Sequence, residues 1–157
     1  MKIFSADQIR AWDRFTIEQR PIASIDLMER AAQAFVNQLL SLYPSEQFLI
    51  FCGNGNNGGD GLAIARLLYR QNRGVEVWLL KDKVLSEDAQ MNYDRLISLN
   101  VPIKSITKEN GVSESDWLRI NAQPFVLIDA LLGTGLNRAV EGDYAEFVHR
   151  IDRKSVV

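Results

Sequence analysis

Two segments of the sequence combine glycine with residues that can bind ligands or move protons. The first runs from Gly53 to Gly61 and the second from Asp129 to Arg138. Each follows a short apolar run, FLIFC or FVLI, and such a run between turn residues predicts a buried strand. Because ligands of doubly wound sheets bind beyond the carboxyl ends of the strands, both segments are candidates for a ligand site.

The first segment, GNGNNGGDG, contains a formal GxGxxG pattern made by Gly53, Gly55 and Gly58. A lone match of this kind is weak evidence for dinucleotide binding. Two further glycines change the expected loop geometry. Asp60 stands at the expected start of the next helix, where a carboxylate would compete with a phosphate for the amide dipoles. The ordinary dinucleotide interpretation is therefore disfavoured.

The asparagines of the first segment offer a different chemistry. Asn56 and Asn57 supply amide oxygens and nitrogens, which suit polar ligand groups or a hard cation. The alternative is a plain turn followed by an Asp N-cap, for which Asn, Gly and Asp are usual residues. The number of glycines and asparagines exceeds what a turn needs, and this favours a backbone that contacts a ligand.

The second segment begins with a carboxylate. Asp129 follows the FVLI run directly, so we expect it at the rim of the sheet, partly desolvated, where it can serve as acid, base or cation ligand. The alternative is an Asp that caps the following turn. Gly133 and Gly135 flank Thr134 and form a potential nest for an anion, which Arg138 could assist, or else a glycine-rich turn.

Other conspicuous residues receive structural interpretations. Cys52 ends an apolar run and is expected to be a small core residue. His149 has no partner His or Cys nearby in sequence, so a surface or hydrogen-bonded histidine is favoured over a metal ligand. The three tryptophans are expected to be packing residues and not a stacking platform for a ligand: Trp12, Trp78 and Trp117.

Helical and strand-like patterns alternate along the chain. A capping box from Ser5 to Gln8 opens a helix through about Arg20, and Ser24 is expected to cap a second helix that Pro44 ends. The apolar positions of this second helix form one broad face: Leu27, Met28, Ala31, Ala32, Phe35, Val36, Leu39 and Leu40. Further helices are predicted after the first glycine-rich segment to about Arg73 with Gly74 as its left-handed cap, from Ser86 to about Asn100, and from about Tyr144 to Ile151.

The predicted strands lie between these helices. Residues 48–52, 75–80 and 125–128 form clear apolar runs, and VPIKSI is a short strand that Pro102 places at an edge. Strands that alternate with helices predict an α/β fold in which βαβ units form a parallel sheet.

Composition narrows the class of protein. The chain has 157 residues, 46% of them hydrophobic and 24% charged, which is typical of one globular domain. A net charge of −2 without a basic run argues against nucleic-acid binding. No apolar run approaches the roughly 20 residues that span a bilayer, and no secretory signal is recognisable, so we expect a cytoplasmic protein. The last residues, RKSVV, resemble the opening of another buried strand, and we expect a single domain over residues 1–157 that is truncated at its C-terminal side.

NGNNGGDGLAIAR and DALLGTGL resemble the two hallmark loops of the NAD(P)HX epimerases, the YjeF N-terminal domain family, and LMERAA resembles an early helix of that family. The resemblance covers essentially the whole chain. It implies a Rossmann-like parallel sheet with helices on both faces and an extra N-terminal helical element. It also implies an isomerase of metabolite repair, which interconverts the R and S epimers of hydrated NADH or NADPH at C6 of the nicotinamide ring.

The family's site residues map onto the two segments. The resemblance implies a K⁺ ion, one per subunit, held by Asn57 and Asp129. It further implies substrate contacts from Asn56, Asn57, Gly58, Gly59, Asp60, Gly133, Thr134, Gly135, Leu136, Asn137, Arg138 and Ala139. A family strand and a Ser/Asp loop that complete the site would follow the present C-terminus. The implied partner is an NAD(P)HX dehydratase, which in many bacteria is fused to the epimerase, and we expect a homo-oligomer.

Asp129 is the expected catalytic residue. Inversion at C6 proceeds either by loss and return of water or by ring opening and reclosure, and both routes move a proton at the hydroxyl. A carboxylate that binds potassium suits a base better than an acid, so Asp60 is the second candidate. Two other functions remain open: a non-catalytic module that binds a nucleotide or a protein, and an NAD-linked oxidoreductase, which would bind undamaged NADH tightly.

Overall fold

The structure is a computed structural model and describes residues 4–19, 22–81, 83–107, 111–133 and 143–152. Four strands of this part of the chain form one parallel sheet in the order β3-β2-β1-β4. They span Gln47–Cys52 (β1), Val75–Leu80 (β2), Ile103–Ile106 (β3) and Phe125–Ala130 (β4). The parallel α/β sheet predicted from the sequence is confirmed, and β3 lies at an edge as Pro102 indicated.

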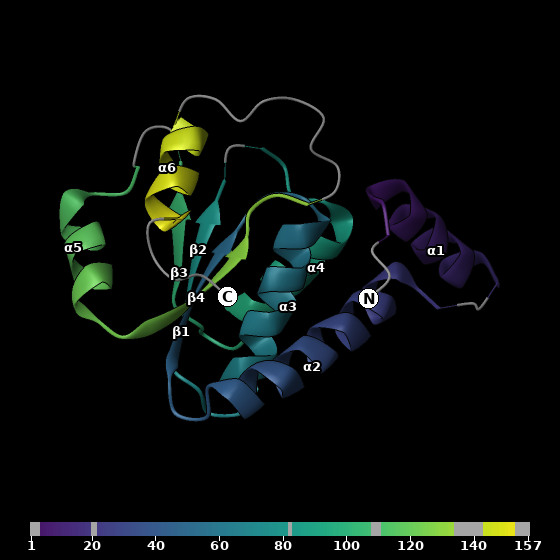
Figure 1. Cartoon of the computed structure of the whole chain (residues 1–157), viewed down its shortest axis with the longest axis horizontal. Coiled ribbons are helices and arrows are strands. Elements are labelled where there is room, and N and C mark those ends of the chain that lie inside the picture. The colour runs from purple at the N-terminus through teal and green to yellow at the C-terminus, as the bar shows by residue number, and fades with distance from the viewer. Residues whose placement is uncertain (1–3, 20–21, 82, 108–110, 134–142, 153–157) are drawn as a thin grey trace.

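Helices cover both faces of this sheet, as expected (Figure 1). The described helices span Ala6–Gln19 (α1), Ser24–Leu42 (α2), Asn56–Arg70 (α3), Glu87–Ile97 (α4), Glu114–Ala122 (α5) and Asp143–Asp152 (α6). Within these residues, none of the helices combines the length and the apolar character that a membrane span needs.

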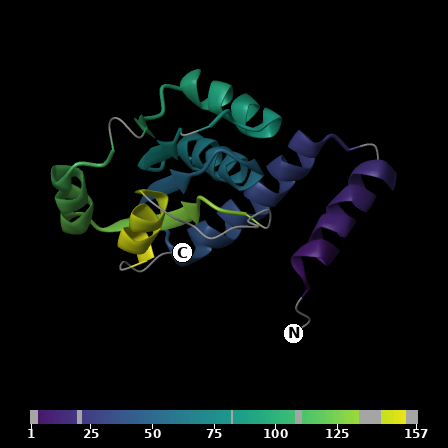
Figure 2. The ribbon, with the colours of Figure 1, turned by 90° about the horizontal axis from the view of Figure 1, so that it is seen from above.

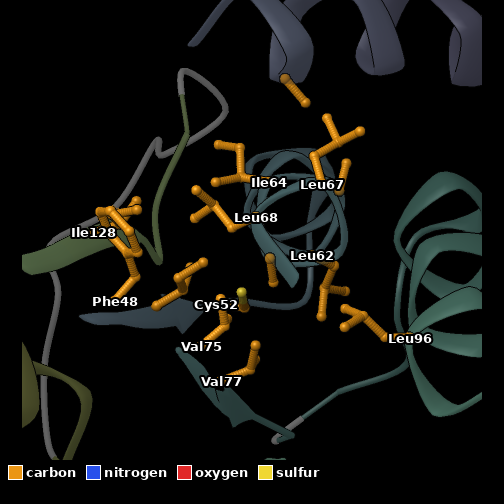
Figure 3. Close-up of a cluster of buried hydrophobic side chains, with 14 of the residues drawn as sticks. Phe48, Cys52, Leu62, Ile64, Leu67, Leu68, Val75, Val77, Leu96 and Ile128 are labelled. Atoms are coloured by element: carbon orange, nitrogen blue, oxygen red, sulfur yellow. The ribbon is translucent and has the colours of Figure 1, made fainter. Parts of the chain in front are cut away.

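Alternation along β1 divides the core into two layers. Phe48, Ile50 and Cys52 pack with apolar residues of α2, α3 and α4, and Figure 3 shows this cluster around Leu62 and Leu68 of α3. The intervening residues of β1 pack on the opposite face with α5 and α6. Residues Phe48 to Cys52 are fully buried on both faces of the sheet, and this explains why the sequence FLIFC is continuously apolar.

The second layer is rich in aromatic side chains. Trp78 of β2 is fully buried, and its ring centroid lies 5.7 Å from those of Phe51 and Trp117. Phe147 of α6 lies 5.5 Å from Phe51 by the same measure. The packing roles expected for Trp78 and Trp117 are confirmed, and both residues lie in the core.

Helix α1 stands apart from the sheet and from the helices that cover its faces, beyond the N-terminal end of α2 (Figures 1 and 2). Its capping box is present, because the Ser5 amide donates to Gln8 Oε1 at 2.8 Å and the Gln8 amide to Ser5 Oγ at 3.3 Å. Trp12 packs against Phe4, with 4.5 Å between the ring centroids, but its side chain is 57% exposed. An amphipathic pattern reports an apolar face, but not what covers it.

Two helix ends differ from the prediction. Ala23 is the N-cap of α2, and the Ser24 hydroxyl instead donates to Asp88 Oδ2 of α4 at 2.5 Å. At the end of α3 the left-handed residue is Asn72, with φ of 57°, and not Gly74. Asparagine tolerates this conformation, so the turn needs no glycine there.

Helix α5 was not predicted. Its capping box joins Ser113 and Asp116, and Trp117 and Ile120 supply the buried face. The Ser-x-x-Asp spacing before an apolar pair was the signal that could have identified it.

Candidate functional site

The two glycine-rich segments leave the same edge of the sheet from neighbouring strands. β1 and β4 pair in parallel with Cys52 opposite Ala130, and the Gly53 amide donates to the Ala130 carbonyl at 3.0 Å. The segments therefore begin side by side, as the sequence predicts for strands that end at a common edge.

The first segment is mostly helix. α3 begins at Asn56, so the loop expected up to Gly61 is only three residues long, and Asp60 lies in the helix instead of at its start. Gly55 is the N-cap and provides no side-chain cap. The first amides of α3 consequently lack a capping side chain, and this makes the helix start suitable for an anion or a polar ligand.

Close packing explains two of the glycines. A Cβ on Gly58 would lie 1.9 Å from the carbonyl oxygen of Gly53, and one on Gly59 would lie 3.0 Å from Met28 Cε. Both residues are buried. Glycine is thus required at position 58 by the turn that brings α3 back over the end of β1, and the substrate contacts expected for both residues remain predictions.

Asn57 connects the two segments directly. The Asn57 Nδ2 donates to the Leu132 carbonyl at 3.1 Å, and a Cβ on Gly133 would lie 3.1 Å from the Cβ of Asn57. Because the amide nitrogen is the donor, the amide oxygen of this half-buried side chain is available as an acceptor or cation ligand. The structure therefore brings Asn57 and the start of the second segment into contact. Asn56, in contrast, is exposed at the helix start.

Asp129 is exposed, which differs from the partly desolvated position predicted for it. Its Oδ1 accepts a hydrogen bond from the Leu131 amide at 2.9 Å, so the turn-capping interaction considered for this residue is present. Asp129 of β4 pairs with Phe51 of β1. Because side chains alternate between the two faces along a strand, the Asp129 side chain lies on the face of the sheet that α5 and α6 cover. A cation site shared with Asn57 requires the carboxylate to reach over the rim.

A cavity of about 300 Å³ lies between α2, α3 and β4. Three of the expected site residues, Asn57, Asp60 and Asp129, line it. Its other lining residues are small or apolar: Ala31, Ala32, Phe35, Gly61, Ile64, Ile128 and Ala130. The contribution of α2 could not be predicted from the sequence, because Phe35 has the same helical spacing as the core residues beside it.

The donors at this edge suit a hard cation. Within the described ranges, no three His, Cys, Asp or Glu side chains gather to hold a metal ion. Asn57 and Asp129 offer amide and carboxylate oxygens, which are the ligand types that alkali and alkaline-earth ions prefer. Cys52 provides no soft ligand, because its thiol is fully buried and burial raises its pKa well above the usual range.

Six of the expected substrate contacts lie outside the described residues: Thr134, Gly135, Leu136, Asn137, Arg138 and Ala139. His149 lies on α6 and is exposed, in agreement with the surface role favoured for it.

Residues 24–157 match the sequence profile of the family described as "YjeF-related protein N-terminus". An NAD(P)H-hydrate epimerase of Limosilactobacillus fermentum is 35% identical over 150 residues, which cover 94% of this chain and 67% of the relative. The chain belongs to the NAD(P)H-hydrate epimerase family. The resemblance inferred from the two glycine-rich segments is thereby confirmed.

Other members of this family extend the comparison. An NAD(P)H-hydrate epimerase of Limosilactobacillus reuteri is 34% identical over 99% of this chain and 70% of its own length. A bifunctional NAD(P)H-hydrate repair enzyme of Thermofilum pendens is 33% identical over 97% of the chain but only 29% of its own length. The chain thus spans about two-thirds of the length of the two Limosilactobacillus epimerases.

A crystal structure of the yeast protein YNL200c has the same fold. The TM-score is 0.79, and the match covers 98% of this chain and 65% of the yeast chain at 21% identity. At this identity the likeness supports the fold, including the parallel sheet with helices on both faces.

Proposed function

We propose that this protein is an isomerase that interconverts the R and S epimers of hydrated NADH and NADPH, in the repair of nicotinamide cofactors. Membership of the epimerase family supports this function. The observation that carries it is the hydrogen bond from Asn57 to the Leu132 carbonyl, because it joins the two segments that resemble the family's hallmark loops.

The chemistry requires a group that moves a proton at the C6 hydroxyl. In one route the lone pair of the ring nitrogen forms a C=N bond as the C6–O bond breaks, and the departing hydroxyl takes a proton and leaves as water. Water then adds to the opposite face and returns a proton. In the other route the ring opens at the C6–N bond and recloses. Asp129 is the proposed acid–base residue for either route, and Asp60, on the same cavity, is the second candidate.

Asp129 is partly prepared for this role. The Leu131 amide donates to Oδ1 and so fixes one carboxylate oxygen, while exposure leaves the other able to meet the substrate. A group that is oriented by its own backbone loses little freedom when the substrate binds.

We assign the remaining substrate contacts to the family positions. Residues 56–60 lie at the uncapped start of α3, where backbone amides favour anionic and polar groups. Residues 133–139 follow β4 and would supply the second set of contacts. In the proposed complex the glycines at positions 133 and 135 would allow close backbone approach to a phosphate, and Arg138 would pair with it.

A potassium ion between Asn57 and Asp129 is part of the proposal. The amide oxygen of Asn57 and a carboxylate oxygen of Asp129 are suitable donors, and this choice of ligands supports it. A cation bound there would supply positive charge beside the substrate's hydroxyl oxygen. The residues of this chain would then orient that hydroxyl toward the carboxylate that moves its proton.

The proposed partner is the NAD(P)HX dehydratase, which consumes the S epimer. The bifunctional relative from Thermofilum pendens, whose name joins repair functions in one chain, supports this pairing. A homo-oligomer and a cytoplasmic location are further parts of the proposal. The exposed apolar residues Ile9 and Trp12 of α1 are consistent with a subunit contact.

The decisive experiment supplies separated R and S hydrates of NADH and NADPH to the purified protein and follows each epimer by chromatography at several potassium concentrations. Epimerisation in both directions to a common ratio is expected. An unchanged epimer ratio, or tight binding of undamaged NADH without epimerisation, would contradict the proposal. Comparison of the two hydrates gives the substrate preference from the ratio of kcat/KM values.

A further inference from the structure

The cavity between α2, α3 and β4 has an apolar side as well as a polar one. Phe35 of α2 lines it and is 37% exposed, whereas Val36 and Leu39 of the same helix are buried. Ile64 and Ile128 line the same side and are 7% and 3% exposed. The polar residues Asn57, Asp60 and Asp129 also line the cavity, and Asp129 does so from a strand position whose side chain faces the other side of the sheet. A cavity with one apolar and one polar side fits a ligand that also has an apolar edge and a polar edge.

Hydration of a reduced nicotinamide ring produces such a ligand. Water adds across the C5–C6 double bond, so that C6 carries a hydroxyl and C5 becomes a methylene beside the existing C4 methylene. These two carbons cannot form ordinary hydrogen bonds, whereas the hydroxyl both donates and accepts. The substrate of the proposed function therefore has an apolar edge next to its reacting carbon.

We propose that Phe35 is a specificity-determining residue, whose ring packs against the C4 and C5 methylenes of the hydrated nicotinamide while the C6 hydroxyl points to the rim of the sheet, over which the Asp129 carboxylate has to reach. This inference rests on the proposed function. The cavity volume of about 300 Å³ is at the small end of ligand pockets and suits one ring and not a whole dinucleotide. The rest of the nucleotide would extend along the rim past the start of α3.

A contact of this kind acts equally on both epimers. The R and S forms share the same C4 and C5 methylenes and differ only in the direction of the hydroxyl at C6. An enzyme that interconverts them has to bind both. Packing against the shared apolar edge satisfies this need, whereas a hydrogen bond to the hydroxyl favours one epimer.

The test compares Phe35→Ala with Leu42→Ala. Leu42 lies on the same helix and is 60% exposed, but it does not line the cavity. We expect Phe35→Ala to raise KM roughly tenfold for both epimers, with kcat within about threefold of the wild type, because an aromatic contact formed with substrate and transition state alike is lost. Phe35→Trp should restore most of the affinity, and Leu42→Ala should match the wild type.

Several outcomes would overturn the inference while the proposed function stands. These are an unchanged KM in an active Phe35→Ala variant, a rise in KM for one epimer only, or a lower melting temperature without a change in KM. The last would make Phe35 a packing residue. If the wild type does not epimerise the hydrates, the proposed function itself fails. Calorimetric binding of hydrated NADH to wild type and Phe35→Ala then still decides whether the ring contacts that ligand.

Discussion

A Cβ on Gly61 would lie 2.6 Å from the Cβ of Ala130 and 2.8 Å from Cys52 Sγ. Gly61 lies in α3, and the other two residues end β4 and β1. The helix thus crosses the strand ends so closely that position 61 has no space for a side chain. This contact holds the start of α3, and with it Asn57, against the edge of the sheet.

Gly61→Ala should therefore destabilise the protein. We expect the free energy of unfolding to fall by about 1–3 kcal/mol, because an overpacked methyl group forces α3 away from the strands. Urea denaturation followed by circular dichroism measures the change. Gly111→Ala is the matched control, because a Cβ there has nothing within 4 Å, and it should change stability by less than about 0.5 kcal/mol. Equal stability of the two variants would contradict the packing described for α3.

The strands of the sheet and the helices between them could be predicted because their local propensity, their apolar pattern and their end signals all indicate the same structure. Strands buried on both faces give continuous apolar runs, and the helices between them show clear apolar stripes and stops. The start of α3 was missed because asparagine and glycine are poor helix formers. Tertiary contacts determine where α3 starts, since Gly58 packs against the Gly53 backbone. Local helix propensity does not predict such a contact.

The polar half of the candidate site could also be predicted, because its residues follow strand ends and have unusual composition. The apolar half could not. Phe35 has the helical spacing of a core residue, and only the arrangement of three elements shows that it lines the cavity beside Asn57. The exposure of Asp129 could not be predicted either, because the sequence ended the strand at Ile128, whereas β4 continues through Asp129 to Ala130 and Asp129 is exposed within it.

Asn57→Ala tests the proposed cation site. Loss of the amide oxygen should raise the potassium concentration for half-maximal epimerisation by roughly tenfold or more, in line with the loss of one ligand interaction. Asn56→Ala is the control, because its side chain is expected to contact the substrate but not the ion. It should change KM for the hydrate and leave the potassium dependence unaltered. The same potassium dependence in both variants would remove Asn57 from the cation site.

The ion pair between Lys104 and Asp116 predicts a pH dependence of stability. Hydrogen bonds from Lys104 and Ser113 lower the pKa of Asp116 from 3.8 to about 2. Because the pKa is lower in the folded protein, the stabilisation is present above about pH 4 and is lost as the pH falls toward 2. Solvent screens this partly exposed pair, so we expect about 1 kcal/mol.

Denaturation of wild type and Asp116→Asn at pH 2, 3, 4 and 6 measures this contribution. The stability difference between the two should be largest at pH 6 and should shrink to the uncharged hydrogen-bond difference near pH 2. Glu114→Gln, which removes an ion pair with Arg150 in which the Glu114 side chain is 74% exposed, should show little difference at any pH. A difference between wild type and Asp116→Asn that does not vary with pH would show that the carboxylate charge is irrelevant there.

Asp129→Asn separates three roles of this residue, because asparagine keeps the size and one carbonyl oxygen but cannot exchange a proton. If Asp129 moves the proton, epimerisation should fall by roughly 10²–10⁴-fold at every potassium concentration. If it only holds potassium, raising the ion concentration should recover much of the rate by mass action. If it only caps the turn through the Leu131 amide, stability and turnover should both change little, because the asparagine oxygen can accept the same hydrogen bond. We expect the first result, measured as rate against potassium concentration with a thermal melt alongside. Turnover close to that of the wild type at low potassium would exclude Asp129 from the chemistry and leave Asp60 as the candidate on the same cavity.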